Sequence, residues 1–315
     1  MIQSATRERP VATRASGTPR PPAGRRARMR SNYPWWLVAP AVLLFGGLFL
    51  APNVLNYVYP FTNWSAYHSE VSFAGLDNVR TVLQDGSLQN ALKVTLIFAG
   101  VVTVMYNVGG LLLALLLYRD TRINRICRSL MFLPVLLSPL AIGYIFDAFL
   151  QDHGALNGVL SGIIGHEVAV SWLGSTTWTI FVVAGIHTWK WLGFSMLVYL
   201  AGLKTVPAEL YESARLDGAG GIRAFRHVTF PLIAPAFTFN IVTACVGSLN
   251  SFDTVLATTQ GGPGDSTQVF NMYMFRIFGQ GLYGQAATIS LALLLVVVLI
   301  AAPLIAYLRR RENVL

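Results

Sequence analysis

Two apolar stretches of the chain each contain polar and aromatic side chains that could bind a polar ligand. The first group, within 177–202, consists of His187, Thr188, Trp189, Lys190, Trp191 and Phe194. The second, within 230–251 and just beyond it, consists of Asn240, Thr243, Ser248, Asn250, Ser251 and Asp253. Polar side chains inside a membrane segment usually face the protein interior or an aqueous cavity, because lipid cannot solvate them. The two groups therefore indicate either a polar path or hydrogen bonding between helices, and the pattern alone favours neither.

Residues suited to catalysis are few. A polar loop holds His153, His166 and Glu167, the candidates for an integral membrane enzyme such as a glycosyl or acyl transferase. Their spacing matches no metal-ligand pattern. Cys127 and Cys245 are far apart in an apolar chain, which indicates neither a disulfide framework nor a metal site. We therefore expect no catalytic site and no metal site in this chain.

The longest polar interruption in the C-terminal half that carries both signs of charge begins at Pro207. This proline suits the first turn of a helix, and Leu210 and Ala214, four residues apart, would share one helix face. Gly218 can adopt the left-handed conformation that ends such a helix. A second short turn is expected at 222–227. The pattern predicts a helix, a glycine turn and another helix, and it would also fit a solvated connector.

The composition indicates a membrane protein. Of 315 residues 54% are hydrophobic and 12% are charged, whereas soluble domains carry roughly 25% charged residues. The net charge of +9 would suit nucleic acid, but the basic residues are confined to particular loops, so we expect no nucleic-acid partner. Residues 1–34, rich in Arg and Pro, predict a disordered basic tail. The apolar run 35–59 is longer than the roughly 7–15-residue core of a signal peptide.

Six apolar stretches are long enough to cross a bilayer, which takes about 20 residues. They are 35–59, 91–118, 130–150, 177–202, 230–251 and 285–308. Trp35 and Trp36 would lie at the membrane interface, and Pro134 and Pro139 would kink the third span. The sequence thus predicts one all-α transmembrane domain, 35–308, between the basic tail and a short tail, 309–315.

Basic residues gather in alternate loops. On one side they are Arg119, Arg122, Arg125, Arg128, Lys204, Arg215, Arg223, Arg226, Arg309, Arg310 and Arg311. The opposite loops hold few, and 151–176 holds none. Loops rich in Lys and Arg stay in the cytoplasm. We therefore expect a multi-pass protein of the cell membrane with both termini, and the polar loop 203–229, on the cytoplasmic side.

The polar loop carries a pattern at fixed spacing. It consists of Glu212-Ser213-Ala214, Asp217-Gly218-Ala219, Phe225, Val228 and Pro231-Leu232. This pattern resembles the EAA loop of ABC importer permeases, which reads E-A-A, D-G-A, F, I and L-P. The departures, Ser213, Val228 and Phe230, are mild. The loop also lies between the expected spans and on the predicted cytoplasmic side.

Further motifs extend the resemblance over most of the chain. They are Phe132-Leu133-Pro134, Gly154-Ala155-Leu156-Asn157, Gly261-Gly262-Pro263 and Tyr283-Gly284-Gln285-Ala286-Ala287. From about Trp35 to Tyr307 the chain resembles the carbohydrate-uptake branch, specifically the maltose-type first permease subunit. The resemblance implies the type I ABC importer fold, with six transmembrane helices and a cytoplasmic EAA coupling helix between helices 4 and 5.

The resemblance also implies a role for the polar loop. ATP is hydrolysed on a separate soluble subunit, which binds ATP and Mg, and this chain has no G-x-x-x-x-G-K-[ST] phosphate loop and would bind no cofactor. The EAA helix would dock in a groove of that ATPase and transmit its closure as a rigid body. The implied coupling residues are Glu209, Leu210, Glu212, Ala214, Arg215, Asp217, Gly218, Ala219, Phe225 and Pro231.

In the maltose-type family, sugar contacts come from the fourth and fifth spans. By spacing they would fall on His187, Trp191, Phe194, Ser248 and Ser251, with Lys190, Asn250 and Asp253 beside them on the substrate path. Aromatic faces would stack on sugar C–H surfaces, while hydroxyls and imidazole form hydrogen bonds. His187 and Trp191 are larger than the residues expected in the maltose member, so the identity of the sugar stays open. Lys190 could instead form an ion pair with Asp147 or Asp253.

The function implied is that of a permease subunit in a binding-protein-dependent importer, forming half of the translocation pathway for a sugar or oligosaccharide. The expected partners are a second homologous permease, two ATPase subunits, an extracytoplasmic substrate-binding protein and membrane lipid. The alternative substrate is glycerol 3-phosphate or another polyol phosphate, whose importer has a similar permease. Lys190 is weak support for such an anion, because a lysine after tryptophan looks common in this family.

Overall fold

The computed structural model describes residues 35–312. These residues form helices joined by loops, with one isolated β-bridge between Thr62 and Phe73. The chain divides into two compact units, Met1–Leu50 and Ala51–Leu315. The predictions for the basic tail, 1–34, and for residues 313–315 lie outside the described residues.

The described part of the first unit is a short helical run. Its elements are η1 (Trp35–Leu37), α1 (Ala39–Phe45) and η2 (Gly46–Leu50). Pro40 lies in the first turn of α1, where its missing N–H would have no partner in any case. The rings of Phe45 and Phe49 stack with centroids 5.0 Å apart. The stretch Ala39–Phe61, long and apolar enough to cross a membrane, covers most of the first expected span.

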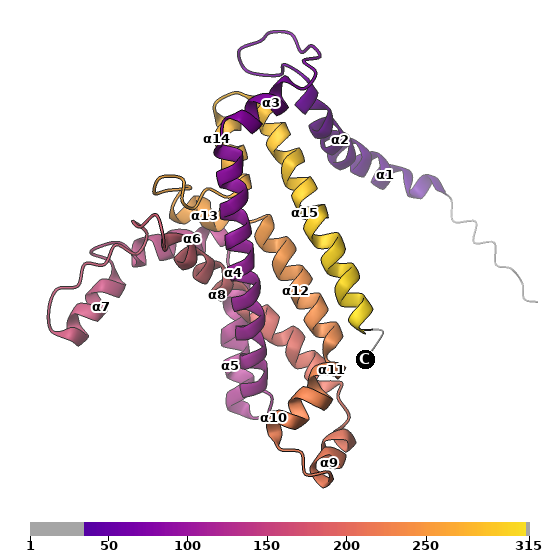
Figure 1. Ribbon diagram of the computed structural model, residues 1–315, viewed down its shortest axis with the longest axis vertical. Helices are drawn as coiled ribbons and strands as arrows, with labels where there is room; N and C mark the ends of the chain where they lie inside the picture. The colour runs from indigo at the N-terminus through magenta and orange to yellow at the C-terminus, as the bar shows by residue number, and fades with distance from the viewer. Residues whose placement is uncertain (1–34, 313–315) are drawn as a thin grey trace, which may run out of the picture. The chain divides into compact units, whose positions relative to one another are not determined.

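The second unit contains the remaining helices. In chain order they are α2 (Ala51–Val58), η3 (Tyr59–Phe61), α3 (Asp77–Gln84), α4 (Ser87–Leu116), α5 (Arg122–Phe132), η4 (Leu133–Leu136), α6 (Pro139–Phe149), α7 (Ala155–Ile164), α8 (Thr179–Lys204), α9 (Ala208–Leu216), α10 (Gly221–Ala224), η5 (Phe225–Thr229), α11 (Phe230–Leu232), α12 (Ala234–Leu249), α13 (Asp253–Thr258), α14 (Phe270–Gly279) and α15 (Tyr283–Glu312). Figure 1 shows α9 and α10 at one end of this unit and α3 and α14 at the other.

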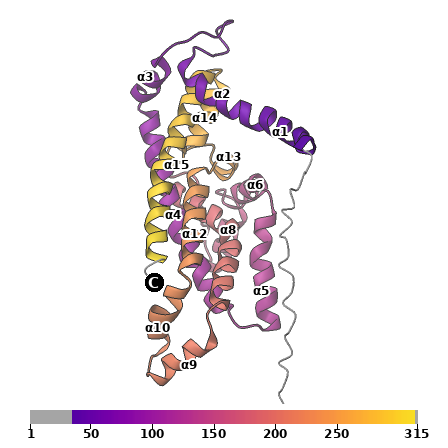
Figure 2. The ribbon, with the colours of Figure 1, turned by 90° about the vertical axis from the view of Figure 1, so that its right-hand side faces the viewer.

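The long helices α4, α8, α12 and α15 pack against one another (Figures 1 and 2). Phe98 of α4 and Val183 of α8 are completely buried. Gly110 lets α4 and α8 approach closely, since a methyl group there would lie 2.0 Å from the hydroxyl oxygen of Ser195. That hydroxyl donates to the carbonyl of Tyr106 at 3.0 Å. Close backbone approach and buried hydrogen bonds are the usual means of joining helices inside a membrane.

By length and composition, the described residues contain four candidate membrane spans, or up to six if two bent helix pairs each count as one. Helices α4, α8 and α15 cover the second, fourth and sixth expected spans. The fifth expected span is bent by 71° between the segments Gly221–Leu232 and Ala234–Leu249. The first, second, fourth and sixth expected spans match the four candidates, and the third and fifth match only if each bent pair is one span.

The third expected span, 130–150, is two helices instead of one kinked helix. Helix α5 already begins at Arg122, and the chain turns by 100° between Arg122–Leu136 and α6. Pro139 has no N–H to donate to the carbonyl of Val135, so a helix cannot continue through this point without losing a hydrogen bond. Pro134 and Pro139 led us to expect a kink. The structure instead has a separate helix, α6, at a large angle to the segment before it.

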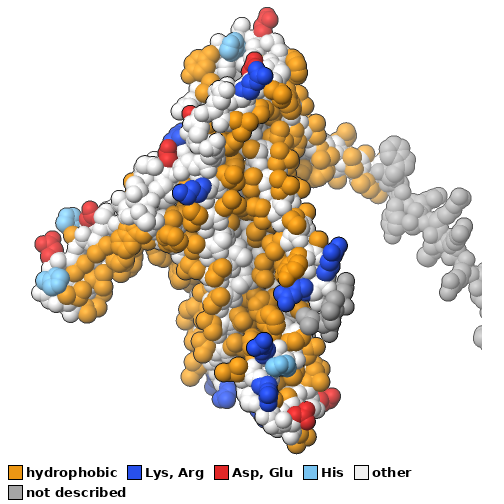
Figure 3. Space-filling view, viewed as in Figure 1, with side chains coloured by type: hydrophobic (Ala, Val, Ile, Leu, Met, Phe, Trp, Pro, Cys, Tyr) orange, Lys and Arg blue, Asp and Glu red, His pale blue; other side chains and the backbone are white. Residues whose placement is uncertain are grey.

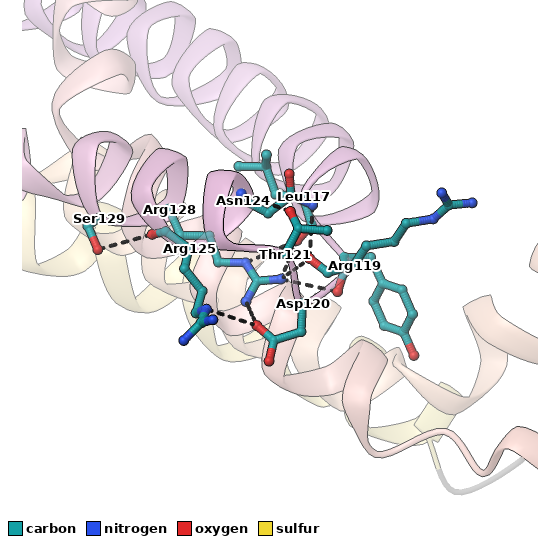
Figure 4. Close-up of polar contacts among 9 residues, drawn as sticks. Leu117, Arg119, Asp120, Thr121, Asn124, Arg125, Arg128 and Ser129 are labelled. Carbon is teal, nitrogen blue, oxygen red and sulfur yellow. Dashed lines mark hydrogen bonds and ion pairs between the residues drawn. The ribbon is translucent and has the colours of Figure 1, made fainter.

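Arg128 holds the turn between α4 and α5 (Figure 4). Its guanidinium donates to the carbonyls of Leu117, Tyr118 and Arg119, which follow the last turn of α4. It also forms an ion pair with Asp120 at 3.6 Å. A cation is favourable at the C-terminal end of a helix, where carbonyl groups lack donors. Arg128 thus has a structural role besides its contribution to the positive charge of this loop.

A polar cluster lies at the opposite end of the second unit, between α3 and α14. The hydroxyl of Tyr273 donates to Asp85 at 3.0 Å, and Arg276 forms an ion pair with Asp265 at 2.8 Å. Hydrogen bonds from Ser87 and Tyr273 hold the pKa of Asp85 below its usual value. Burial raises the pKa of Tyr273 to about 12. These contacts fasten α14 to the turn that precedes α4.

Candidate functional site

A cavity of about 350 Å³ lies between α4, α8 and the end of α12. Its walls are Val102, Tyr106, Pro139, His187, Trp191, Phe194, Thr243, Ala244, Gly247, Ser248, Asn250, Ser251, Phe252, Asp253 and Thr254. Seven of the eight residues that the sequence predicts on a substrate path are in this set. The structure therefore brings the two polar groups together, while their contact with a substrate stays a prediction.

Helix periodicity explains the α8 wall. His187, Trp191 and Phe194 are spaced by four and three residues, so they lie on one face of α8 and line the cavity together. Trp189 points elsewhere and packs against Phe146, with ring centroids 5.3 Å apart. The His187 ring lies edge-on to Phe98, and its Nδ1 lies 3.4 Å from the Thr254 hydroxyl.

The end of α12 supplies the polar wall. Ser248 donates its hydroxyl to the Ala244 carbonyl at 2.6 Å, and Asn250 donates its amide to the Val246 carbonyl at 2.8 Å. Ser251 is 5% exposed, and its hydroxyl oxygen has no hydrogen-bond partner within the described part of the chain. A buried hydroxyl that faces a cavity without a partner is costly, and a bound ligand or water would satisfy it.

Asn240, the earliest member of the second polar group, has a different role. It is completely buried, and its amide donates to the Ser195 carbonyl at 3.2 Å. The Tyr199 hydroxyl donates to the Asn107 side chain nearby at 2.5 Å. For Asn240 the interpretation as hydrogen bonding between helices is therefore confirmed.

Lys190 is a correction to the sequence-based substrate path. It lies outside the set of cavity residues and is 2% exposed. Its ammonium donates to the Val135 carbonyl at 3.1 Å and lies 4.2 Å from the centre of a Trp191 ring. The suggested ion pairs with Asp147 or Asp253 are absent from the described residues. The Val135 carbonyl needs this donor because the residue four positions on, Pro139, has no N–H.

The predicted helix, glycine turn and second helix are confirmed in 208–229. Pro207 precedes α9 instead of occupying its first turn. Gly218 has a φ of 72°, and the N–H of Ala219 donates to the Ala214 carbonyl at 2.9 Å, which closes the end of α9. The hydroxyl groups of Tyr211 and Thr229 lie 3.0 Å apart and connect α9 to η5.

The coupling surface, which we define as the exposed side chains of α9 and α10, combines charge with apolar groups. Ala214 is buried, whereas Glu209, Glu212 and Asp217 are exposed. Leu216 and Ile222 are 90% and 87% exposed, and sequence reasoning missed both. For Leu216 a signal was available, because it lies on α9 away from Ala214, the buried residue of that helix. Figure 3 shows Lys and Arg side chains gathered around this end of the unit.

Asn157 connects the parts of the loop that holds His153, His166 and Glu167. Its amide donates to the carbonyls of Asp152 and Val170, and its oxygen accepts from the Trp172 indole at 2.9 Å. His166 and Glu167 are exposed. Within the described residues, no group of three or more His, Cys, Asp or Glu side chains is arranged to hold a metal ion.

A protein-family model described as "Binding-protein-dependent transport system inner membrane component" matches residues 106–311. The chain is 32% identical over 274 residues to a probable starch degradation products transport system permease protein, AmyD, of Thermoanaerobacterium thermosulfurigenes, covering 84% of this chain and 90% of the relative. It is 30% identical over 277 residues to an sn-glycerol-3-phosphate transport system permease protein, UgpA, of Agrobacterium fabrum, covering 85% of this chain and 92% of the relative.

A solved structure has the same fold. It is the crystal structure of a bacterial ABC transporter involved in the import of the acidic polysaccharide alginate, and the chain aligns with a TM-score of 0.74 at 24% sequence identity. The alignment covers 88% of this chain and 96% of that chain. This likeness confirms the expected all-α, type I ABC importer fold.

Proposed function

This chain belongs to the family of binding-protein-dependent transport system inner membrane components, and from that premise we propose that it forms half of the translocation pathway for a sugar or oligosaccharide. It is a multi-pass membrane subunit of an ABC importer. The alternative function, an integral membrane enzyme with His153, His166 and Glu167 as candidate residues, receives no support from this family.

The observation that carries the proposal is the pairing of aromatic and polar walls in one cavity. Trp191 and Phe194 offer ring faces, and Ser251 offers a buried hydroxyl that has no partner in the described part of the chain. Sugars present C–H faces beside hydroxyl groups, and cavities that bind such ligands combine apolar walls with a few placed polar groups. The relative named for transport of starch degradation products supports the same class of substrate.

The cavity belongs to one chain, and we propose that a second homologous permease supplies the other half of the pathway. An extracytoplasmic binding protein would deliver the substrate at the end that holds α3 and α14. Both termini and the α9–α10 loop would face the cytoplasm, as the distribution of Lys and Arg predicts. Two ATPase subunits would bind there, and they would hold the ATP and Mg.

The coupling surface suits this role. Leu216 and Ile222 expose apolar side chains, and Glu212 lies one helical turn before Leu216 on α9. Exposed apolar groups rimmed by charge are typical of a protein–protein interface. The closed end of α9 at Gly218 makes the helix a rigid body that can transmit a rotation.

The test is purification through a tag on this chain, followed by reconstitution in proteoliposomes. We expect three other kinds of polypeptide in the complex, and ATP-dependent uptake of labelled neutral oligosaccharides when binding protein is present. The isolated chain should hydrolyse no ATP. Robust hydrolysis by the lone chain, or uptake that needs no ATPase subunit, would refute the proposal.

Glycerol 3-phosphate, or another polyol phosphate, is the second candidate substrate, because UgpA is a similar permease. The same proteoliposomes test it directly. Uptake of glycerol 3-phosphate without uptake of any oligosaccharide would show that the substrate is the polyol phosphate and not a sugar. The permease function would stand.

A further inference from the structure

The cavity has one formal carboxylate and no lysine or arginine among the described residues that line it. The carboxylate is Asp253, the first residue of α13, at the turn that follows α12. Asp253 is partly exposed and has neither a hydrogen bond nor an ion pair among the described side chains. Its negative charge is therefore available to whatever occupies the cavity.

Ser251 strengthens this assignment. Ser251, which is 5% exposed, lies two residues before Asp253, and its hydroxyl also has no partner among the described residues. A carboxylate accepts hydrogen bonds and a hydroxyl both donates and accepts. Neighbouring hydroxyl groups of a sugar could satisfy both side chains at once. Two polar side chains without a partner among the described residues therefore line the same cavity.

Lys190, on the same helix as the aromatic wall, is not among the described residues that line the cavity. Lys190 donates to the Val135 carbonyl and is 2% exposed. Its neighbourhood is tight, since a methyl group at Gly193 would lie 2.1 Å from the Met131 carbonyl oxygen. Moving the ammonium into the cavity would strand the Val135 carbonyl without a donor inside the protein, which is costly. Lys190 therefore forms no ion pair with Asp253 among the described residues, and its ammonium lies against Trp191 in the wall of the cavity.

Resting on the proposed sugar-permease function, we propose that this cavity selects neutral glycans and excludes anionic ones, with Asp253 as the specificity-determining residue. The carboxylate, together with Ser251, receives sugar hydroxyl groups. A uronate, aldonate or phosphate would instead bring a second negative charge beside Asp253. Like charges a few ångströms apart repel, and each disfavours the ionised form of the other.

The experiment uses the purified importer complex, without binding protein, in lipid nanodiscs. The ligands are maltose, lactose and cellobiose, each beside its own aldonate, which is the same disaccharide with a carboxylate at the oxidised end. Glycerol 3-phosphate is a phosphate probe. Saturation-transfer NMR and competition give the ratio of neutral to anionic affinity. In the wild type we expect the neutral member of at least one pair to bind at least about tenfold more tightly.

Variants locate the cause of the selectivity. Asp253→Asn should bring the ratio of neutral to anionic affinity close to one, and Asp253→Glu should keep the wild-type ratio. Lys190→Gln should leave the ratio unchanged, because its ammonium does not reach the ligand. Recovery of the whole complex on a size-exclusion column is measured for each variant. If Asp253→Asn fails to assemble, Asp253→Glu still tests whether a carboxylate at this position maintains the ratio.

The outcomes separate this inference from the proposed function. Tighter binding of aldonates or glycerol 3-phosphate than of neutral sugars would overturn the inference alone. An unchanged ratio in Asp253→Asn, loss of the ratio in Asp253→Glu, or weaker anion binding in Lys190→Gln would also overturn it. Failure of the reconstituted importer, with binding protein present, to take up any neutral oligosaccharide would refute the sugar-permease function, and the inference with it.

Discussion

The ammonium nitrogen of Lys190 lies 3.1 Å from the carbonyl oxygen of Val135, the carbonyl that Pro139 leaves without a backbone donor. A residue of α8 thus completes the hydrogen bonding of a break in the third expected span. The same ammonium lies against Trp191, which lines the cavity. The break, the cavity wall and α8 are therefore connected through one side chain.

Replacing Lys190 tests this connection. Lys190→Gln should lower the stability of the complex by about 1–3 kcal/mol, because a buried carbonyl loses its donor. Lys190→Arg should retain a donor and lose less. The measurement is the thermal midpoint of the purified complex. An unchanged midpoint in Lys190→Gln would mean that the Val135 carbonyl finds another partner.

Gly193 tests the packing of α8 against α5. Gly193→Ala would place a methyl group 2.1 Å from the Met131 carbonyl oxygen, and forced overpacking of this kind costs about 1–3 kcal/mol. Gly185→Ala, on the same helix with nothing within 4 Å of the added methyl, is the matched control. Equal thermal midpoints for the two variants would contradict the close approach of α8 and α5.

Part of this site could be predicted from the sequence. His187, Trp191 and Phe194 share a helix face by spacing alone, and Gly218 is suited to the turn after α9. Lys190 could not be placed, because its partner carbonyl lies far away in the chain. The contact depends on the 100° turn within the third expected span. Local pattern predicts a face of a helix, whereas a break and its long-range partner depend on tertiary packing.

The two tryptophans of α8 offer a matched pair for substrate binding. Trp191 lines the cavity, whereas Trp189 packs against Phe146 away from it. Trp191→Ala should weaken oligosaccharide uptake roughly tenfold, about 1.4 kcal/mol, with the complex still assembled. His187→Ala should act in the same direction. Trp189→Ala should change uptake less. Failure of both Trp191→Ala and His187→Ala to assemble would favour a role in helix packing.

The exposed apolar side chains of the coupling surface give a prediction about the ATPase. Leu216→Asp and Ile222→Asp should each reduce recovery of the ATPase subunit with the membrane subunits, because a buried unpaired charge destabilises an interface. Ile123→Asp, at a residue of α5 that is 72% exposed, is the control outside the loop. Quantitative gels of the tagged complex provide the measurement. Full ATPase recovery in both loop variants would exclude them from the interface.

The last prediction concerns the shape of the α9–α10 loop. Gly218 has a φ of 72°, whereas Gly220 has a φ of −69°, and neither has an atom within 4 Å of an added methyl group. A side chain at Gly218 is therefore opposed by backbone strain alone, roughly 1–2 kcal/mol. Gly220→Ala carries no such strain and is its control.

Gly218→Ala should insert normally and keep its substrate cavity, since the strain lies in the loop. We expect it to lose part of the stimulation of ATP hydrolysis by loaded binding protein, because an α9 with a distorted end transmits the ATPase rotation poorly. Glu212→Lys should show the same loss through charge repulsion with a basic ATPase residue. The decisive assay is substrate-stimulated hydrolysis in proteoliposomes, with Gly220→Ala alongside. Wild-type stimulation in both Gly218→Ala and Glu212→Lys would make this loop a solvated connector.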